Sequence, residues 1–406
     1  MADHALGRRF WTVWAATSTS NLGDGISITT FPLLAISLTD DALLVSLVAV
    51  GRALPFLVAG LPLGLVVDRF DRRIVALGSQ AFRSAVILLL AIAVAADKAS
   101  IAMLVAAAFV VGFGEVLTDG ATPALVRSVV RQDQLEVANS RLAAAMTVTN
   151  AFIGPPLGAA LFVLSDWLPL VSVVVAFIAA GMLMAALPGR YVAGVDETET
   201  ASLVGQITLG LKYVWAHPAL RPLALTVAVF SFLNEASDSI FVILVTDRFG
   251  VGEIGFGVLI SVDAAAAVIT SFFVSAIVRR IGHAGSMRVS VLLYVFGSML
   301  FGFGTSVGFA IAASVFMGLS NPMWNVVSST IRQRLVPDHI FGRMMTAYLF
   351  IAWGVQPLGA LTGGLVARTW GPEWVYRLTV LALLTLFFAA RPMFAAVTKA
   401  LRSDDP

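Results

Sequence analysis

The chain has 406 residues, of which 59% are hydrophobic and 12% are charged, and its formal net charge is +2. Soluble domains carry about 25% charged residues, so most of this chain must face lipid or other helices rather than water. The chain has no cysteine and four histidines, which argues against disulfides and metal sites, and its small net charge argues against nucleic-acid binding.

Runs of mostly apolar residues recur along the chain, and each is long enough for a helix to cross a bilayer. The first run follows Arg9 directly and has no small-residue cleavage site after it, so we interpret it as a retained span rather than a signal peptide. The predicted spans are residues 10–37, 42–67, 74–96, 101–126, 137–164, 168–187, 219–245, 254–278, 286–304, 307–330, 341–366 and 373–397. The sequence therefore predicts an all-α integral membrane protein with twelve transmembrane helices.

Basic residues are unevenly distributed among the breaks between these spans. With the N-terminus inside, the outer segments hold only Lys98, Arg248, Arg368 and Arg377, and the other loop arginines are cytoplasmic. Because positive residues stay inside, both termini are predicted to be cytoplasmic. Lysine is scarce relative to arginine, which is typical of a high-GC bacterial chain, so we expect a multi-pass protein of the bacterial inner membrane.

The longest polar break, residues 188–222, divides the chain into two similar halves. It holds an acidic stretch at residues 196–199 and an amphipathic segment at residues 203–215, suited to the membrane interface. We expect an N-terminal six-helix bundle at 1–187, a cytoplasmic linker at 188–222 and a C-terminal six-helix bundle at 223–406. Residues 47–69 align with 258–280 without a gap, and the PLGA sequence at 156–159 recurs at 357–360. Two related halves are typical of secondary transporters.

Ionisable residues interrupt several of the predicted spans. Such residues are costly in lipid and usually face a bundle interior or water. They are Asp24 in the first span, Arg52 in the second, Arg83 in the third, Glu115 and Asp119 in the fourth, Glu235 and Asp238 in the seventh, and Asp263 in the eighth. The spacing places Glu115 with Asp119, and Glu235 with Asp238, on shared helix faces.

Neighbouring carboxylates in a membrane cannot all be ionised, so this set of acids is suited to exchanging a proton for a cationic substrate. An alternative is that several of them form structural ion pairs, for example Arg83 with Glu115 or Asp119. Arg52 and Asp263 occupy matching repeat positions, and they either form a bridge between the halves or lie near the cavity.

The loop between the second and third spans reads GLVVDRFDRR over residues 64–73. It resembles the signature G-x-x-x-D-[RK]-x-G-[RK]-[RK] of the major facilitator superfamily, with Asp71 where that pattern has glycine. This variant resembles the drug-exporter branch that includes macrolide-efflux and enterobactin-exporter proteins, as do residues 22–25, 115–121 and 154–158. The resemblance implies the major facilitator fold, with two pseudo-symmetric six-helix bundles whose spans one, four and seven line a central cavity.

The same resemblance implies a cytoplasmic latch. Asp68 would pair with Arg127 and with the N-terminus of span eleven, where a helix dipole favours an anion. Gly64 would allow close helix packing, and Arg69, Arg72 and Arg73 would complete the motif. The alternative is that the three arginines serve only as positive-inside anchors.

Gly154, Pro155 and Pro156 resemble the antiporter motif of the family. The prolines remove backbone donors and kink a helix, so a bent fifth span is expected to act as a gate against the eighth. Arg141 and Asn150 stand where that motif has glycines, and a packing kink without a coupling role is the alternative.

These features together predict a proton-coupled exporter of small amphipathic or cationic compounds that works by alternating access. The alternative is a proton-coupled uptake symporter of a small metabolite. We expect no enzyme activity and no cofactor, because no nucleophilic triad, metal cluster or phosphate loop is recognisable. The expected partners are a small-molecule substrate, protons and the lipid bilayer, and the chain is expected to be a monomer.

Overall fold

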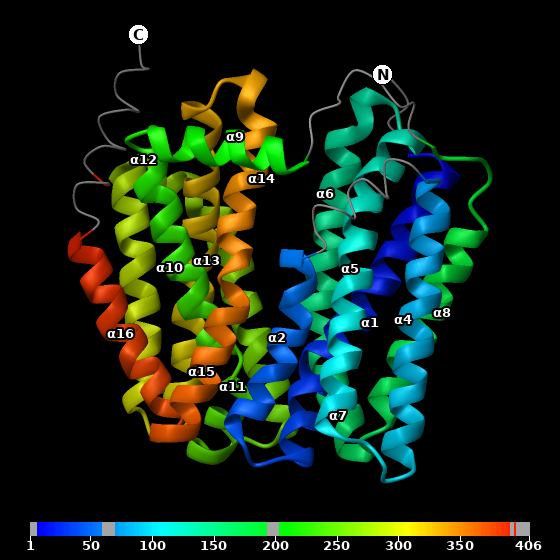
Figure 1. Ribbon diagram of the computed structural model, residues 1–406, viewed down its shortest axis with the longest axis horizontal. Coiled ribbons are helices and arrows are strands. Elements are labelled where there is room, and N and C mark those ends of the chain that lie inside the picture. Colours follow the sequence, from blue (N-terminus) through cyan, green and yellow to red (C-terminus); the bar gives the residue numbers. More distant parts are fainter. Residues whose placement is uncertain (1–5, 59–69, 193–202, 390–393, 395–406) are drawn as a thin grey trace. The chain divides into compact units, whose positions relative to one another are not determined.

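The computed structural model describes residues 6–58, 70–192, 203–389 and 394, and every regular element among these residues is a helix (Figure 1). The chain divides into two compact units, and each is described by itself. Unit 1 comprises Met1–Asp40, Leu47–Thr200 and Gly252–Ser261, and unit 2 comprises Asp41–Ser46, Ala201–Val251 and Val262–Pro406. The helices α2 and α12 are therefore each divided between the two units.

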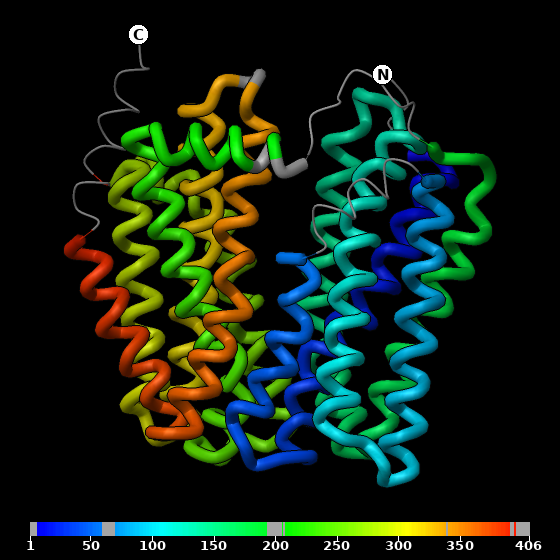
Figure 2. The backbone as a smooth tube through the Cα atoms, in the orientation of Figure 1, coloured from blue at the N-terminus to red at the C-terminus, as the bar shows by residue number. Residues whose placement is uncertain are grey.

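Unit 1 contains helices from the first half of the chain, traced in Figure 2 from blue to green. In chain order they are α1 (Arg8–Leu38), α2 (Ala42–Val58), α4 (Arg72–Ala95), α5 (Ile101–Val129), η1 (Gln132–Gln134), α6 (Leu135–Met146), η2 (Thr147–Ile153), α7 (Gly154–Leu164) and α8 (Leu168–Ala185). Helix α1 packs against α7 and α8, and α4 packs against α5 and α8. This packing brings α1, α4 and α5 together around the polar residues described below.

Unit 2 contains the remaining helices. They are α9 (Leu203–Ala216), α10 (Leu220–Asp238), α11 (Phe241–Ile243), η3 (Leu244–Arg248), α12 (Glu253–Phe303), α13 (Val307–Leu335), α14 (Asp338–Gly354), α15 (Gln356–Trp370) and α16 (Pro372–Ala389). Helix α10 packs against α15, and the predicted amphipathic segment forms α9, which packs against α14. A buried apolar core includes Phe230, Tyr294 and Trp324.

Several of these helices have the length and composition of membrane spans. Eight helices among the described residues are long and apolar enough to cross a bilayer, and nine if Thr208–Ala216 and Leu220–Asp238, bent by 110°, count as one span. Helix α12 has 51 residues and contains a break at Gly282, whose φ of 74° is outside the helical region. An unbroken helix of that length would extend about 75 Å, more than twice the thickness of a hydrocarbon core.

The departure from the loop signature at Asp71 has a local structural explanation. Asp71 precedes α4, and its carboxylate accepts a hydrogen bond from the Arg73 backbone N–H at 3.0 Å. The Arg73 side chain donates to the carbonyl oxygens of Met184, at 3.1 Å, and Ala185 at the end of α8. An aspartate thus caps the start of α4, and Arg73 ties that end to α8.

The proline pair of the fifth span follows a π-helical segment. Pro155 and Pro156 lack the N–H groups that would reach back four residues, so the Ala151 and Phe152 carbonyls lose their usual donors. The π-helix η2 ends at Ile153, where these residues begin. The Ser261 hydroxyl donates to the Phe152 carbonyl at 3.3 Å, and the Thr29 hydroxyl donates to the Pro155 carbonyl at 3.1 Å. A side chain from α12 therefore replaces part of the missing helical bonding, and Thr29 ties α1 to the start of α7.

Helices α1 and α7 cross where two glycines meet. A Cβ atom on Gly25 would lie 2.5 Å from the Asn150 carbonyl oxygen and 2.8 Å from the Asn150 Cα, and a Cβ on Gly154 would lie 2.5 Å from the Gly25 Cα. The obstructing atoms are backbone atoms, which cannot rotate away as a flexible side chain does. The crossing therefore requires glycine at position 25 of α1. Helix α1 still approaches closely here, although Asn150 on the facing segment stands where the antiporter motif has glycine.

This crossing gives a stability prediction. We expect Gly25→Ala to lower the free energy of unfolding by about 1–3 kcal/mol, because the added methyl forces the two helices apart. The matched control is Gly78→Ala on α4, where a Cβ meets nothing within 4 Å and where alanine is the better helix former by up to about 1 kcal/mol. Unfolding in detergent, followed by tryptophan fluorescence, measures both variants. Equal free energies of unfolding for Gly25→Ala and Gly78→Ala would contradict the close approach of α1 and α7 at Gly25.

Candidate functional site

Five of the eight predicted intramembrane charges lie in unit 1. They are Asp24 on α1, Arg52 on α2, Arg83 on α4, and Glu115 and Asp119 on α5. The other three, Glu235 and Asp238 on α10 and Asp263 on α12, lie in unit 2. The two sets differ in the partners of their carboxylates.

Arg83 and Asp24 form a buried ion pair at the centre of unit 1. The Arg83 side chain is fully buried, and its Nη2 donates to the Asp24 carboxylate. Its guanidinium also stacks on the Phe177 ring, 3.9 Å from the centroid. Gly114 on α5 provides the space for this arrangement, because a side chain there would overlap the aliphatic stem of Arg83. The alternative prediction that paired Arg83 with Glu115 or Asp119 is wrong, since its ion pair is with Asp24.

Arg52 and Glu115 form the second ion pair of unit 1. The Arg52 Nη2 lies 3.2 Å from one Glu115 carboxylate oxygen and 3.4 Å from the other. Both side chains are partly accessible. Two of the three intramembrane acids of unit 1 are therefore each paired with an arginine.

Asp119 is the third acid of this cluster. It follows Glu115 by one helical turn, and its charge interacts with those of Glu115, Asp24, Arg83 and Arg52. Its side chain is exposed in unit 1, in contrast to that of Asp24. Within the described part of the chain, Asp119 forms no ion pair. Among the three intramembrane acids of unit 1, Asp119 is therefore the one without an arginine partner in the described residues.

A buried polar stripe on α4 supports the cluster and was not identified from the sequence. The Gln80 amide donates to the Ser20 hydroxyl at 2.8 Å, and the Ser79 hydroxyl donates to the Gly114 carbonyl at 2.7 Å. Ser79, Gln80, Arg83 and Ser84 are all buried. Ser79 with Arg83, and Gln80 with Ser84, are four residues apart and share a helix face. This spacing in the sequence indicates a polar interior.

Among the intramembrane acids of unit 2, Asp238 has a neutral partner. The Tyr294 hydroxyl donates to the Asn234 side-chain oxygen at 3.2 Å, and the Asn234 amide donates to the Asp238 carboxylate at 2.6 Å. Asp263 lies close enough to Asp238 for their charges to interact, and the charge of Glu235 reaches Tyr294. Among the residues that the structure describes, neither Asp238 nor Asp263 is paired with a basic side chain.

Aromatic rings surround the Tyr294–Asn234–Asp238 chain. Phe230 stacks on Trp324 with centroids 5.2 Å apart, and Tyr294 meets Phe230 edge-on at 4.8 Å. Tyr294 was not identified from the sequence. The signal was a polar residue every four positions in the second part of α12, at Ser286, Ser290, Tyr294 and Ser298, all of which are buried.

The residues of the predicted latch are only partly described. Gly64, Asp68 and Arg69 lie outside the described residues, and Arg127 is exposed near the end of α5. The Arg72 backbone N–H donates to the Tyr191 carbonyl at 3.1 Å. The latch itself stays a prediction, as does gating by Gly154, Pro155 and Pro156. No group of three or more metal-ligating side chains occurs in the described ranges.

The family model of the major facilitator superfamily matches residues 13–355, most of the chain. The chain belongs to the major facilitator superfamily. It is 24% identical over 379 residues to the multidrug efflux pump Tap of Mycolicibacterium fortuitum, which covers 91% of this chain and 92% of that protein. It is 25% identical over 360 residues to the multidrug efflux pump Tap of Mycobacterium tuberculosis, covering 86% of this chain and 84% of that protein.

Solved structures of transporters share the major facilitator fold with this chain. The nucleoside transporter NupG matches with a TM-score of 0.77 at 11% identity, covering 96% of this chain and 99% of NupG. A bacterial homologue of the iron transporter ferroportin matches with a TM-score of 0.76 at 16% identity, covering 97% and 99%. At these identities the likeness establishes the fold alone. The chain is thus a multi-pass, all-helical transporter of the major facilitator superfamily, a family of small-molecule transporters rather than enzymes.

Proposed function

We propose that this transporter exports small amphipathic or cationic compounds in exchange for protons, by alternating access. The observation that carries the proposal is the unequal pairing of its intramembrane acids. Asp24 and Glu115 each have an arginine partner, whereas Asp119 and Asp238 are accessible and have no ion pair within the described residues. Each unit therefore contains an intramembrane acid whose charge can be neutralised reversibly by a proton or by a cationic substrate.

A carboxylate in a membrane span is stable when it is protonated, hydrated or paired with a cation. Asp119 and Asp238 can satisfy this requirement with a proton in one state and with a cationic substrate in another. Because the same carboxylate cannot hold both, binding of one favours release of the other. Together with alternating access, this competition couples a proton gradient to movement of the substrate.

The direction of transport is inferred from the relatives. The two proteins compared above are named multidrug efflux pumps, which supports export over the alternative of uptake.

The twelve-span count and the membrane orientation also belong to this proposal. Dividing α12 at Gly282 raises the eight apolar helices to nine, and α1, α2 and α10 bring the total to twelve. With twelve spans, the arginine-rich loops place both termini in the cytoplasm of a bacterium. We propose that the protein works there as a monomer of two six-helix halves.

The proposal is tested with inside-out membrane vesicles that contain the protein and have an acidic interior. Ethidium, a cationic fluorescent dye, is the probe, and its entry into the vesicles reports export. We expect ethidium to enter the vesicles while the pH gradient is present. Its entry should stop when an uncoupler abolishes the gradient. Dye transport that is indifferent to the gradient would refute proton coupling, and gradient-driven movement out of such vesicles would indicate the uptake symporter instead.

A further inference from the structure

Unit 1 contains a groove that is separate from its acid cluster. The groove has a volume of about 460 Å³ and runs between the beginning of α1 and the α6–η2 segment, which is within the range of roughly 300–1,000 Å³ typical of small-molecule sites. Its wall is almost wholly apolar and includes Trp11 and Trp14 from α1 and Ala144 and Val148 from the facing segment. None of the intramembrane acids lines it.

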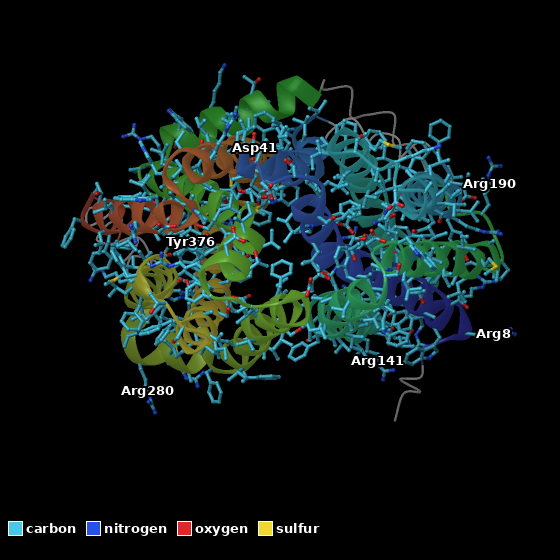
Figure 3. The ribbon with its side chains drawn as sticks, turned by 90° about the horizontal axis from the view of Figure 1, so that it is seen from below. Arg8, Asp41, Arg141, Arg190, Arg280 and Tyr376 are labelled. Atoms are coloured by element: carbon cyan, nitrogen blue, oxygen red, sulfur yellow. The ribbon has the colours of Figure 1, made fainter. Side chains whose placement is uncertain are left out.

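Among the described residues that line the groove, the one charged side chain is that of Arg141. Its guanidinium lies 5.0 Å from the centroid of the Trp11 ring, and the Trp14 indole N–H donates to the Arg141 carbonyl at 3.2 Å. Trp11 and Trp14 contact each other edge to face. Figure 3 shows Arg141 at the edge of its unit, with its side chain directed outward. The groove thus combines a fixed aromatic wall with an exposed, permanently positive group at its rim.

The position of the groove along α1 corresponds to the surface region of a bilayer. Helix α1 begins at Arg8, so Trp11 and Trp14 lie about 5 Å and 9 Å along its axis. Tryptophan is enriched at this level of a membrane, where its ring meets the headgroups. In the orientation that we propose for the transporter, this is the cytoplasmic leaflet, and that part of the inference rests on the proposed function.

We propose that this groove binds an anionic phospholipid. The phosphate contacts Arg141, and one acyl chain lies along Trp11, Trp14 and Val148. Charge complementarity selects the occupant: a basic pocket between membrane helices favours anionic headgroups, and Arg141 repels the cationic compounds that we propose as cargo. Arginine is suited to this contact because its planar fork matches the oxygens of a phosphate group.

The experiment uses the full-length protein, freed of lipid in a neutral detergent and titrated with phosphatidylglycerol or with phosphatidylcholine of the same acyl chains. Bound lipid is counted by native mass spectrometry. We expect phosphatidylglycerol to bind more tightly and Arg141→Gln to weaken it about fivefold, the contribution of one arginine near a lipid surface. Phosphatidylcholine also has a phosphate, but its choline cation offsets that charge, so its binding should be weaker from the start and should lose less with Arg141→Gln. Arg190→Gln is the matched control, because Arg190 is another exposed arginine of unit 1 that does not line the groove.

A second variant tests the acyl-chain part of the site. Ala144→Leu narrows the groove and leaves Arg141 in place, so it should weaken binding of both lipids. Equal effects of Arg141→Gln and Arg190→Gln, or equal affinity for the two lipids, would overturn the proposal, as would displacement of the bound lipid by ethidium. The titration measures lipid binding and requires no transport. A negative result therefore does not contradict the export proposal, and failure of the export test does not contradict selective lipid binding.

Discussion

Asp119→Asn is expected to abolish ethidium export driven by a pH gradient. The substitution keeps the size of the side chain and removes its exchangeable proton and its negative charge. Asp119 is the intramembrane acid of unit 1 that forms no ion pair among the described residues. Its neighbours Asp24 and Glu115 are each paired with an arginine, so neither is free to replace it. Gradient-driven export should fall to that of vesicles without the protein, and Asp119→Glu should recover part of it.

Two further readouts separate loss of coupling from loss of folding. Exchange of dye across the membrane with no pH gradient should persist in Asp119→Asn if substrate still binds, whereas a misfolded protein would lose it. Asp133→Asn is the matched control, because Asp133 pairs with Arg131 at 3.2 Å and both side chains are exposed. Normal gradient-driven export by Asp119→Asn would show that this acid does not carry the proton.

Arg83→Met is expected to have the largest effect on stability. It would leave the Asp24 carboxylate buried without its partner, and breaking a buried ion pair in this way costs about 3–5 kcal/mol. The Arg83 side chain is 0% exposed and that of Asp24 is 7% exposed, so water cannot compensate for the missing charge. The loss of the guanidinium contact with the Phe177 ring adds to the effect.

The double variant Arg83→Met, Asp24→Asn distinguishes this explanation from a simple packing defect. Removing both charges should recover most of the lost stability, because the desolvation cost disappears with the ion pair. Unfolding by a denaturing detergent in mixed micelles measures each variant. For the exposed Arg131–Asp133 pair, Arg131→Met should change the free energy of unfolding by no more than about 1 kcal/mol. A double variant no more stable than Arg83→Met would refute the account.

The fold was largely predictable because the bilayer imposes a simple rule on the sequence. A helix is the natural way for a chain to cross lipid with its backbone bonds satisfied, so apolar runs of the right length indicate spans directly. The break between the spans at 254–278 and 286–304 was predicted, although Gly282 as its position was not. An interruption at Pro155 and Pro156 was predicted because prolines remove backbone donors. The π-helical segment before Gly154 was not predicted, because the new donor to the freed Phe152 carbonyl is Ser261, which lies 109 residues away in the sequence.

The positions of the intramembrane charges were predictable, but their partners were not. Asp24 and Arg83 are 59 residues apart, and nothing in the local sequence distinguishes Asp24 from Glu115 or Asp119 as the partner of Arg83. The choice depends on space, and Gly114 provides it on the facing helix. Neutral partners such as Tyr294 were missed because a tyrosine in an apolar run resembles ordinary core, and only its spacing from Ser290 and Ser298 indicated a polar face.

The most direct test of proton exchange uses purified protein in sealed liposomes that contain a pH-sensitive dye and have no pH gradient at the start. An ethidium gradient is then imposed. The account predicts that dye moving down its gradient drives protons in the opposite direction, and that Asp119→Asn and Asp238→Asn lose this proton movement. Ethidium crossing through the wild-type protein with no accompanying change in internal pH would contradict the exchange of cargo for protons.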